Sequence, residues 1–191
     1  MPARPAPRSV VVIAALALFT IWITWRAKAL EMGTSHMEGS ASRMTGKPAP
    51  AFSLESLDGH PVSLDTYHGK TLVATFWASW CGPCRLEIPV LVKFYQQTHK
   101  PDSNFEIVAI SVDTDKDDAA GAAKNLKMPF PVLLDPDSKV ANTYSVDAIP
   151  TMFVIKDGKV VYTHTGFTMG MDFLLAQQLD MKNYTPGGGK P

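Results

Sequence analysis

Cysteine is scarce in this chain of 191 residues: there are only two, and both lie in the run Trp80-Cys81-Gly82-Pro83-Cys84. A framework of several disulfides is therefore excluded, because neither cysteine has another partner. A zinc site would need two further strong ligands, and the five histidines are scattered singly along the chain. Two cysteines separated by two residues can close and reopen a disulfide with little backbone movement. The spacing therefore predicts thiol–disulfide exchange.

The chain also lacks an excess of either charge, since 18 basic residues balance 18 acidic ones. Residues 1–46 hold five basic and two acidic residues, which leaves 13 basic and 16 acidic residues in the remainder. Phosphate binding needs clustered lysine and arginine, so a nucleic-acid partner is disfavoured. No internal repeat is visible.

Only one long hydrophobic run is present, at residues 10–25, and it has basic residues on both sides (Arg4 and Arg8 before it, Arg26 and Lys28 after it). Such a run fits either a cleaved signal peptide or a retained signal anchor. The small-x-small sequence Ala27-Lys28-Ala29 is a poor cleavage site because of its lysine. We therefore predict an anchor over residues 1–29 and an exported domain, since the dithiol chemistry suits an oxidising compartment.

The segments on either side of the central part have the composition of linkers. Residues 30–46 are rich in Gly, Ser, Thr, Met and Ala, and we expect them to form a flexible tether. Residues 184–191 contain three consecutive glycines and are expected to be a disordered tail. A single domain over residues 47–183 remains, which is the usual size for one hydrophobic core.

Within this domain, the pattern of apolar residues predicts an α/β fold. An alternating hairpin near residues 52–64 comes first, and a nearly continuous apolar strand follows at residues 71–77. A helix is expected to open near Cys81 and to end near Thr98. The predicted order, β-β-β-α-β-α-β-α-β-β-α, implies a mixed central sheet with helices on both faces.

The helix start gives the two cysteines different chemical roles. Unpaired N–H groups and the positive end of the helix dipole favour an anion, so we expect Cys81 to be exposed, to have a depressed pKa and to attack, with Arg85 one turn away. Cys84 is expected to be more buried and to resolve the mixed disulfide. Gly82 would allow a tight turn, and Pro83 suits a first helical turn because it has no N–H.

A second motif, Ala148-Ile149-Pro150-Thr151, leads into the late hairpin. A proline there could simply begin the strand. We predict instead a cis Ile149–Pro150 bond, which would present the Ile149 backbone to an extended substrate strand beside the disulfide.

The segment Phe76–Arg85, together with Glu87 and Pro89, resembles the active-site segment of membrane-tethered bacterial thioredoxins of the TlpA and ResA type. The residues from Tyr144 to Gly158 are similar to the cis-proline region of that family. The resemblance spans about residues 46–179. It implies a thioredoxin fold with an N-terminal β-hairpin and a central α/β insertion. It also implies a reductant of protein disulfides on the periplasmic side of the bacterial inner membrane, or an exported soluble protein if the N-terminal segment is cleaved.

The same resemblance suggests partners and further site residues. Family members commonly serve cytochrome c maturation, and a membrane-embedded electron donor would have to re-reduce the dithiol; no cofactor is implied. Thr75 occupies the position of the buried aspartate of thioredoxin, and Glu87 matches a functional glutamate of ResA-like proteins. Glu87 could otherwise be an exposed helix residue paired with Arg85. Trp80 is expected at the rim of the site, where it would shield the dithiol and contact substrate.

Three other functions use similar scaffolds. A disulfide oxidase or isomerase would use the same Cys81–Cys84 pair at a more oxidising potential. A copper metallochaperone would bind the metal through the thiols and methionines. A peroxidase of related fold usually has a proline and a threonine before its reactive cysteine, where this chain has Ala74 and Ala78.

Overall fold

The computed structural model describes residues 16–24 and 40–186, and the chain divides into two units, 1–38 and 39–191. In the first unit, residues 16–24 are helical. None of the helices in the described ranges has both the length and the apolarity needed to cross a membrane. Most of the predicted anchor, and residues 30–39 of the predicted tether, lie outside these ranges.

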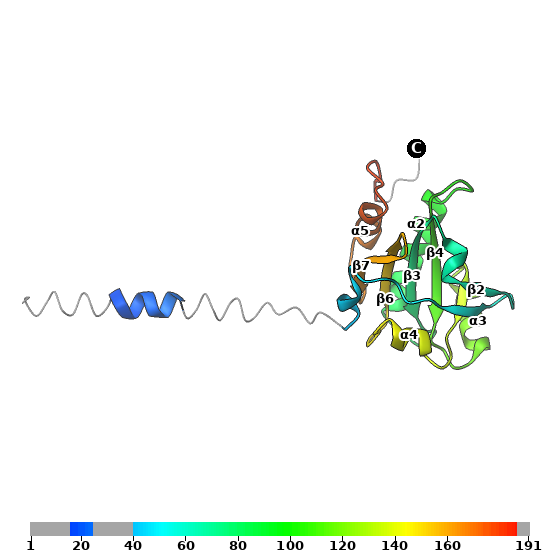
Figure 1. The fold of residues 1–191 in the computed structure, drawn as a ribbon, viewed down its shortest axis with the longest axis horizontal. Coiled ribbons are helices and arrows are strands. Elements are labelled where there is room, and N and C mark those ends of the chain that lie inside the picture. Colours follow the sequence, from blue (N-terminus) through cyan, green and yellow to red (C-terminus); the bar gives the residue numbers. More distant parts are fainter. Residues whose placement is uncertain (1–15, 25–39, 187–191) are drawn as a thin grey trace, which may run out of the picture. The chain divides into compact units, whose positions relative to one another are not determined.

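The second unit is built on one seven-stranded mixed sheet with the order β2-β1-β5-β4-β3-β6-β7 (Figure 1). Strands β3, β4 and β5 are parallel, whereas β6 pairs antiparallel with β3 and β1 pairs antiparallel with β5. The strands are β1 Ser53–Ser56, β2 Pro61–Ser63, β3 Thr71–Trp77, β4 Phe105–Ser111, β5 Val132–Leu134, β6 Thr151–Lys156 and β7 Lys159–Thr165. The predicted α/β class and the predicted element order are confirmed.

Strand β3 lies at the centre of the sheet because both of its faces are apolar. Every residue from Thr71 to Trp77 is buried, as the continuous hydrophobic run predicts. Val73 and Trp77 belong to one hydrophobic cluster, and Ala74 and Phe76 to the other. The sheet therefore separates two cores, and β3 contributes to both.

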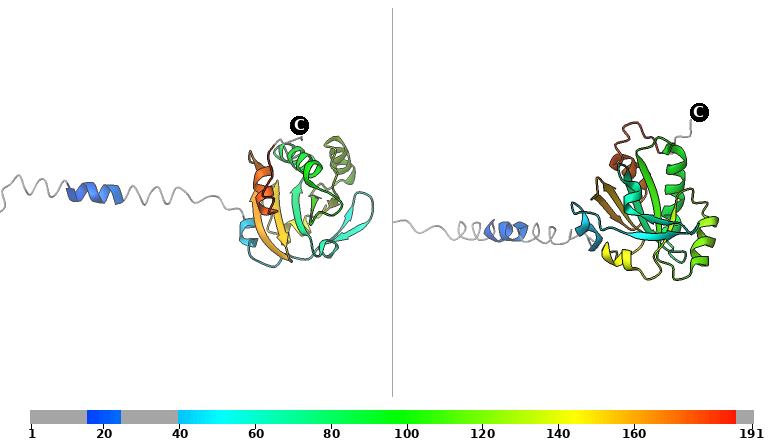
Figure 2. Two further views of the ribbon diagram at one scale, coloured as in Figure 1. Left: turned by 90° about the horizontal axis from the view of Figure 1, so that it is seen from above. Right: turned by 45° about the vertical axis from the view of Figure 1, so that its right-hand side comes forward.

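Helices cover both faces of the sheet (Figure 2). The first cluster contains side chains of α2 and α5, and the second contains side chains of α4 and of the short helix η1. The helical elements are η1 Ser40–Met44, η2 Leu64–Tyr67, α2 Cys84–Thr98, α3 Lys116–Asn125, α4 Lys139–Thr143 and α5 Met171–Gln178. This layering leaves the carboxyl end of β3 free to carry the cysteine turn.

The packed unit extends beyond the expected boundaries at both ends. Ala41 and Met44 of η1 are buried in the second cluster, although residues 30–46 were expected to be a tether. Tyr184, placed in the expected tail, donates a 2.7 Å hydrogen bond to Asp172, and its ring packs at a tilted angle against Phe94. Small and polar residues suggested linkers at both ends, but Ala41, Met44 and Tyr184 pack against the domain.

Candidate active site

Cys81 and Cys84 form a disulfide with an S–S distance of 2.04 Å, at the carboxyl end of β3. The regular helix α2 begins at Cys84, three residues later than expected, and Cys81 lies in the preceding turn. Pro83 occupies the cap position and already has helical angles (φ −61°, ψ −32°); because it has no N–H, it leaves no unpaired donor at this helix end. The amino end of α2 therefore lies directly beneath the sulfur pair.

The surroundings of Cys81 differ in part from the prediction. In this oxidised state Cys81 is buried, with 5% of its surface exposed, and not exposed as expected; Cys84 is completely buried. The Cys84 N–H donates to the Cys81 sulfur at 3.2 Å. The Ile149 carbonyl oxygen lies 3.6 Å from the same sulfur, a contact without a shared proton because a disulfide sulfur carries none. Cys81 thus has the helix-terminal donor that would stabilise a thiolate.

Arg85 has a different role from the expected one. Its guanidinium donates to the Ser79 carbonyl oxygen, from Nε at 3.2 Å and from Nη2 at 2.9 Å. The positive charge is therefore directed to the backbone of the turn before Cys81. We find Arg85 holding the loop instead of facing the sulfur.

The predicted cis Ile149–Pro150 bond is present. Pro150 precedes β6, and the Thr151 hydroxyl donates to the Ala148 carbonyl at 2.7 Å across this bond. Ile149 is half-buried, and its carbonyl faces Cys81. The two motifs found in the sequence thus meet at one site, although they are separated by 68 residues.

The surface around the disulfide is open on the side where a partner would approach. Trp80 is 68% exposed, and Gly82 and Pro83 are both exposed. Gly82 does not have a positive φ, and a Cβ atom there would meet nothing within 4 Å, so the backbone does not demand glycine at this position. A groove of about 400 Å³ beside Trp80 and Ile149 is lined in addition by apolar side chains, among them Val112, Ala141, Val146 and Ala148.

Glu87 is completely buried, which rules out the exposed, ion-paired alternative. Its Oε1 accepts a 2.7 Å hydrogen bond from the Thr75 hydroxyl of β3. Glu87 lies three residues after Cys84 in α2, and residues with this spacing are neighbours on one helix face, with Cβ atoms about 5–6 Å apart. Thr75, which stands at the position of the thioredoxin aspartate, is therefore hydrogen-bonded directly to Glu87.

Burial determines the protonation of Glu87. Loss of hydration raises the pKa of its carboxyl from 4.5 to about 7, and the Thr75 hydrogen bond opposes this increase in part. Within residues 40–186, Glu87 Oε2 has no hydrogen-bond partner, and neither has the buried Nε1 of Trp77. A carboxyl with a pKa near neutrality, beside the buried cysteine, can take up or release a proton at working pH.

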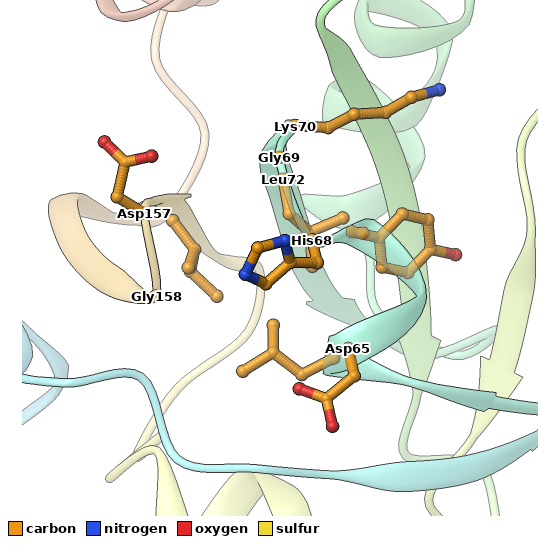
Figure 3. A pocket seen from close by; sticks show the side chains of 10 residues that line it. Asp65, His68, Gly69, Lys70, Leu72, Asp157 and Gly158 are labelled. Carbon is orange, nitrogen blue, oxygen red and sulfur yellow. The ribbon is translucent and has the colours of Figure 1, made fainter.

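Two further observations concern metal binding and a second pocket. The described residues contain no group of three or more His, Cys, Asp or Glu side chains arranged to hold a metal ion. A pocket of about 270 Å³ opens at the amino end of β3, where Figure 3 shows the His68 imidazole between Asp65 of η2 and the Asp157–Gly158 turn. The seven residues of β3 separate it from the cysteines by about 20 Å, so it is not part of the redox site.

The residues that hold the cysteine turn were not found from the sequence. Asp113, just beyond the end of β4, accepts hydrogen bonds from Ser79 and from the Ser111 hydroxyl. A signal was present, because parallel strands β3 and β4 end at the same edge of the sheet and Asp113 lies two residues after the end of β4. The Thr75–Glu87 pair was also missed, since its members lie 12 residues apart on different elements.

The fold and the sulfur pair define a thioredoxin-fold thiol–disulfide oxidoreductase. Residues 45–163 match the model of the AhpC/TSA family. The chain is 37% identical over 129 residues to the thiol-disulfide oxidoreductase ResA of Bacillus subtilis, an alignment that covers 67% of this chain and 71% of that protein. The chain belongs to the AhpC/TSA family and, more particularly, to its ResA-like thiol–disulfide oxidoreductases.

Solved structures agree with this assignment. The thioredoxin domain of a thiol-disulfide oxidoreductase from Bacteroides vulgatus superimposes with a TM-score of 0.61 at 29% identity, covering 70% of this chain and 95% of that one. A thiol:disulfide interchange protein from a Bacteroides species gives a TM-score of 0.63 at 26% identity, with 73% and 92% of the two chains covered.

Proposed function

We propose that this oxidoreductase works in the reducing direction, on disulfides of proteins outside the cytoplasm, with apocytochrome c among the candidate substrates. The observation that supports this most is the Cys81–Cys84 pair at the start of α2, with the cis Ile149–Pro150 bond opposite it. The Gly-Pro pair between the cysteines is that of thioredoxin, whose potential is about −270 mV. A disulfide of this potential is stable, so the dithiol gives up its electrons readily.

In the proposed reaction the Cys81 thiolate attacks one sulfur of the substrate disulfide. The substrate S–S bond breaks, a Cys81–substrate bond forms, and the departing substrate thiolate takes a proton. Cys84, as thiolate, then attacks the Cys81 sulfur and releases the second substrate thiol. Two electrons and two protons pass to the substrate, and the enzyme is left with the Cys81–Cys84 disulfide.

Substrate recognition is assigned to the exposed rim of the site. The Ile149 backbone would bond to an extended substrate strand, and Pro150 would keep that edge open. Trp80 offers a large exposed apolar surface beside it, and Gly82 and Pro83 leave room over the sulfurs.

Glu87 is proposed to accept the proton of Cys84 during the second step. The carboxyl lies one helical turn from that thiol, its pKa of about 7 lets it change protonation near neutral pH, and its Oε2 has no other partner among residues 40–186. Cys84 is completely buried, so water reaches it poorly and an internal base is needed.

The oxidised enzyme must be re-reduced, and we assign this to a membrane-embedded electron donor. Residues 1–29 would hold the domain at the periplasmic side of the inner membrane, close to that donor. If this segment is cleaved, the domain would instead be exported and soluble. Proteins carrying disulfides would be its partners in either case.

Trapping tests the proposal. With Cys84→Ala, Cys81 can form the mixed disulfide but nothing resolves it, so substrates should accumulate on the full-length protein in cells. Cys81→Ala is the matched control. We expect captured exported proteins with cysteine pairs, and capture no greater than in the control would refute a protein reductase. Equilibration with glutathione tests the direction separately, because a potential near −120 mV would indicate an oxidase.

A further inference from the structure

The turn that carries Cys81 is held on both sides of Ser79. The Ser79 N–H donates to Oδ2 of Asp113 at 2.9 Å, and its hydroxyl donates to Oδ1 at 2.7 Å. Its carbonyl oxygen accepts from the Arg85 guanidinium at 2.9 Å. These groups belong to two successive peptide units, so the backbone on either side of Ser79 is fixed. The Cys81 N–H then closes the turn on the Ala78 carbonyl at 3.1 Å.

Asp113 itself is buried, with 3% of its surface exposed, just beyond the end of β4. Its Oδ2 also accepts a 2.7 Å hydrogen bond from the Ser111 hydroxyl. A buried carboxylate is costly unless donors surround it, and here most of the donors come from the turn before the nucleophile. An apolar side chain at this position would avoid that cost but could not hold the turn.

The Asp113–Ser79 contact matters more in the reduced enzyme than in the disulfide form. While the S–S bond is closed, it fixes the Cys81 sulfur by itself. Once the bond opens, the sulfur is fixed only by its own backbone. Stabilisation of a thiolate by the Cys84 N–H, now 3.2 Å away, then depends on a rigid turn.

We propose that Asp113 is a positioning residue for Cys81: its carboxylate holds the Ala78–Cys81 turn, so that in the reduced enzyme the Cys81 sulfur stays over the amino end of α2. The inference rests on the proposed role of Cys81 as the attacking thiol. The proposal adds Asp113, 32 positions after Cys81 in the sequence, as a residue that controls the reactivity of the Cys81 thiol without touching it.

Asp113 variants separate the effect of its charge from the effect of its hydrogen bonds. Asp113→Asn removes the charge. With its oxygen in place of Oδ2 it keeps the acceptor for the Ser79 N–H and the Ser111 hydroxyl, and its amide group can donate to the Ser79 hydroxyl. Asp113→Ala removes both. Ser111→Ala deletes the hydroxyl bond to the same carboxylate and the acceptor of the Asp113 N–H, but it removes no bond to Ser79, so it controls for general loss of stability.

The measurement is the thiolate absorbance of Cys81 against pH in the full chain, with Cys84→Ala so that one thiol titrates. We expect Asp113→Ala to titrate about one pH unit above Asp113→Asn, which is about tenfold less thiolate at pH values below both midpoints. With Cys84 restored, a Cys81 pKa one unit higher makes the potential about 30 mV more negative at pH values above both midpoints, where the reduced form carries the thiolate. In Ser111→Ala the pKa of Cys81 should be the same as in the protein that carries Cys84→Ala alone.

The inference would be overturned if Cys81 had the same pKa in the Asp113→Ala and Asp113→Asn variants. It would also be overturned if Ser111→Ala raised the Cys81 pKa as much as Asp113→Ala does. Circular dichroism of each variant shows whether it is folded. If Asp113→Ala does not fold, Ser79→Ala removes only the hydroxyl bond and should give a smaller increase in the same direction; no increase there would also refute the proposal. Because the titration needs no substrate, failure of the trapping experiment would be distinguishable from failure here.

Discussion

Replacing Glu87 by glutamine should change how the stability of the oxidised protein depends on pH. The carboxyl has a pKa of about 7 in the folded protein against an ordinary value of 4.5. Between these values the folded state binds more protons than the unfolded state, so the free energy of unfolding falls as the pH rises. The loss begins near pH 4.5 and is complete above about pH 7.

The size of this effect follows from the two pKa values. Their difference corresponds to about 3 kcal/mol, the cost of ionising a fully buried carboxyl that has one donor. Glutamine does not ionise, and its oxygen can still accept from Thr75. Its amide group lacks an acceptor, but that cost is the same at every pH. The informative quantity is therefore the change in the stability difference between wild type and Glu87→Gln.

Urea unfolding of the full-length disulfide form at pH values from 4 to 8 measures this difference, and the bonded cysteines do not titrate. Wild type should lose about 3 kcal/mol relative to Glu87→Gln across this range. Glu55→Gln is a suitable control, because Glu55 is largely exposed and pairs with Lys116 at the surface. A stability difference for Glu87→Gln that stays constant to within about 0.5 kcal/mol would refute the reasoning.

Two further predictions concern neighbouring side chains. Thr75→Val removes the hydroxyl that favours the ionised form of Glu87, so the pKa of Glu87 should rise above 7 by about one unit, whereas Thr75→Ser should leave it unchanged. The pH titration of the buried carboxylic acid band in the infrared spectrum measures this, and identical titrations of the two variants would contradict it. Trp80→Ala should lower kcat/KM for a protein disulfide about tenfold but scarcely affect a small aromatic disulfide or the melting temperature, because Trp80 is exposed. An equal loss on both substrates would argue against a role in protein recognition.

Local patterns in the sequence were sufficient to predict the fold. The apolar run at Thr71–Trp77 predicts a strand buried on both faces, and the Asp157-Gly158 turn predicts the late hairpin; both are present. The Cys81–Cys84 pair and the cis Ile149–Pro150 bond were also predicted from short motifs. Such features depend on neighbours in the chain, and the sequence displays these directly.

The contacts that tune the site could not be predicted in the same way. Ser79 and Asp113 lie 34 residues apart, and their contact depends on the register in which β3 and β4 end. Burial of Glu87 depends on the direction in which one face of α2 points against β3, and a single glutamate in a helix is usually exposed. Helix α2 begins at Cys84 and not near Cys81 as predicted, because residues 81–83 form the turn before it. Side-chain partners on separate elements require the assembled structure.

The position of η1 affects where the domain can be shortened. Composition alone would recommend starting a recombinant fragment at Lys47, the first residue of the predicted domain. That choice would discard Met44 and Ala41 from the second core, together with the 2.9 Å bond from the Ser40 N–H to Asp147. Asp147 lies two residues before Ile149, so such a fragment would lose a support of the loop that faces the sulfurs. A fragment beginning upstream of Ser40 should keep its native redox behaviour, whereas the shorter one would give a misleading potential.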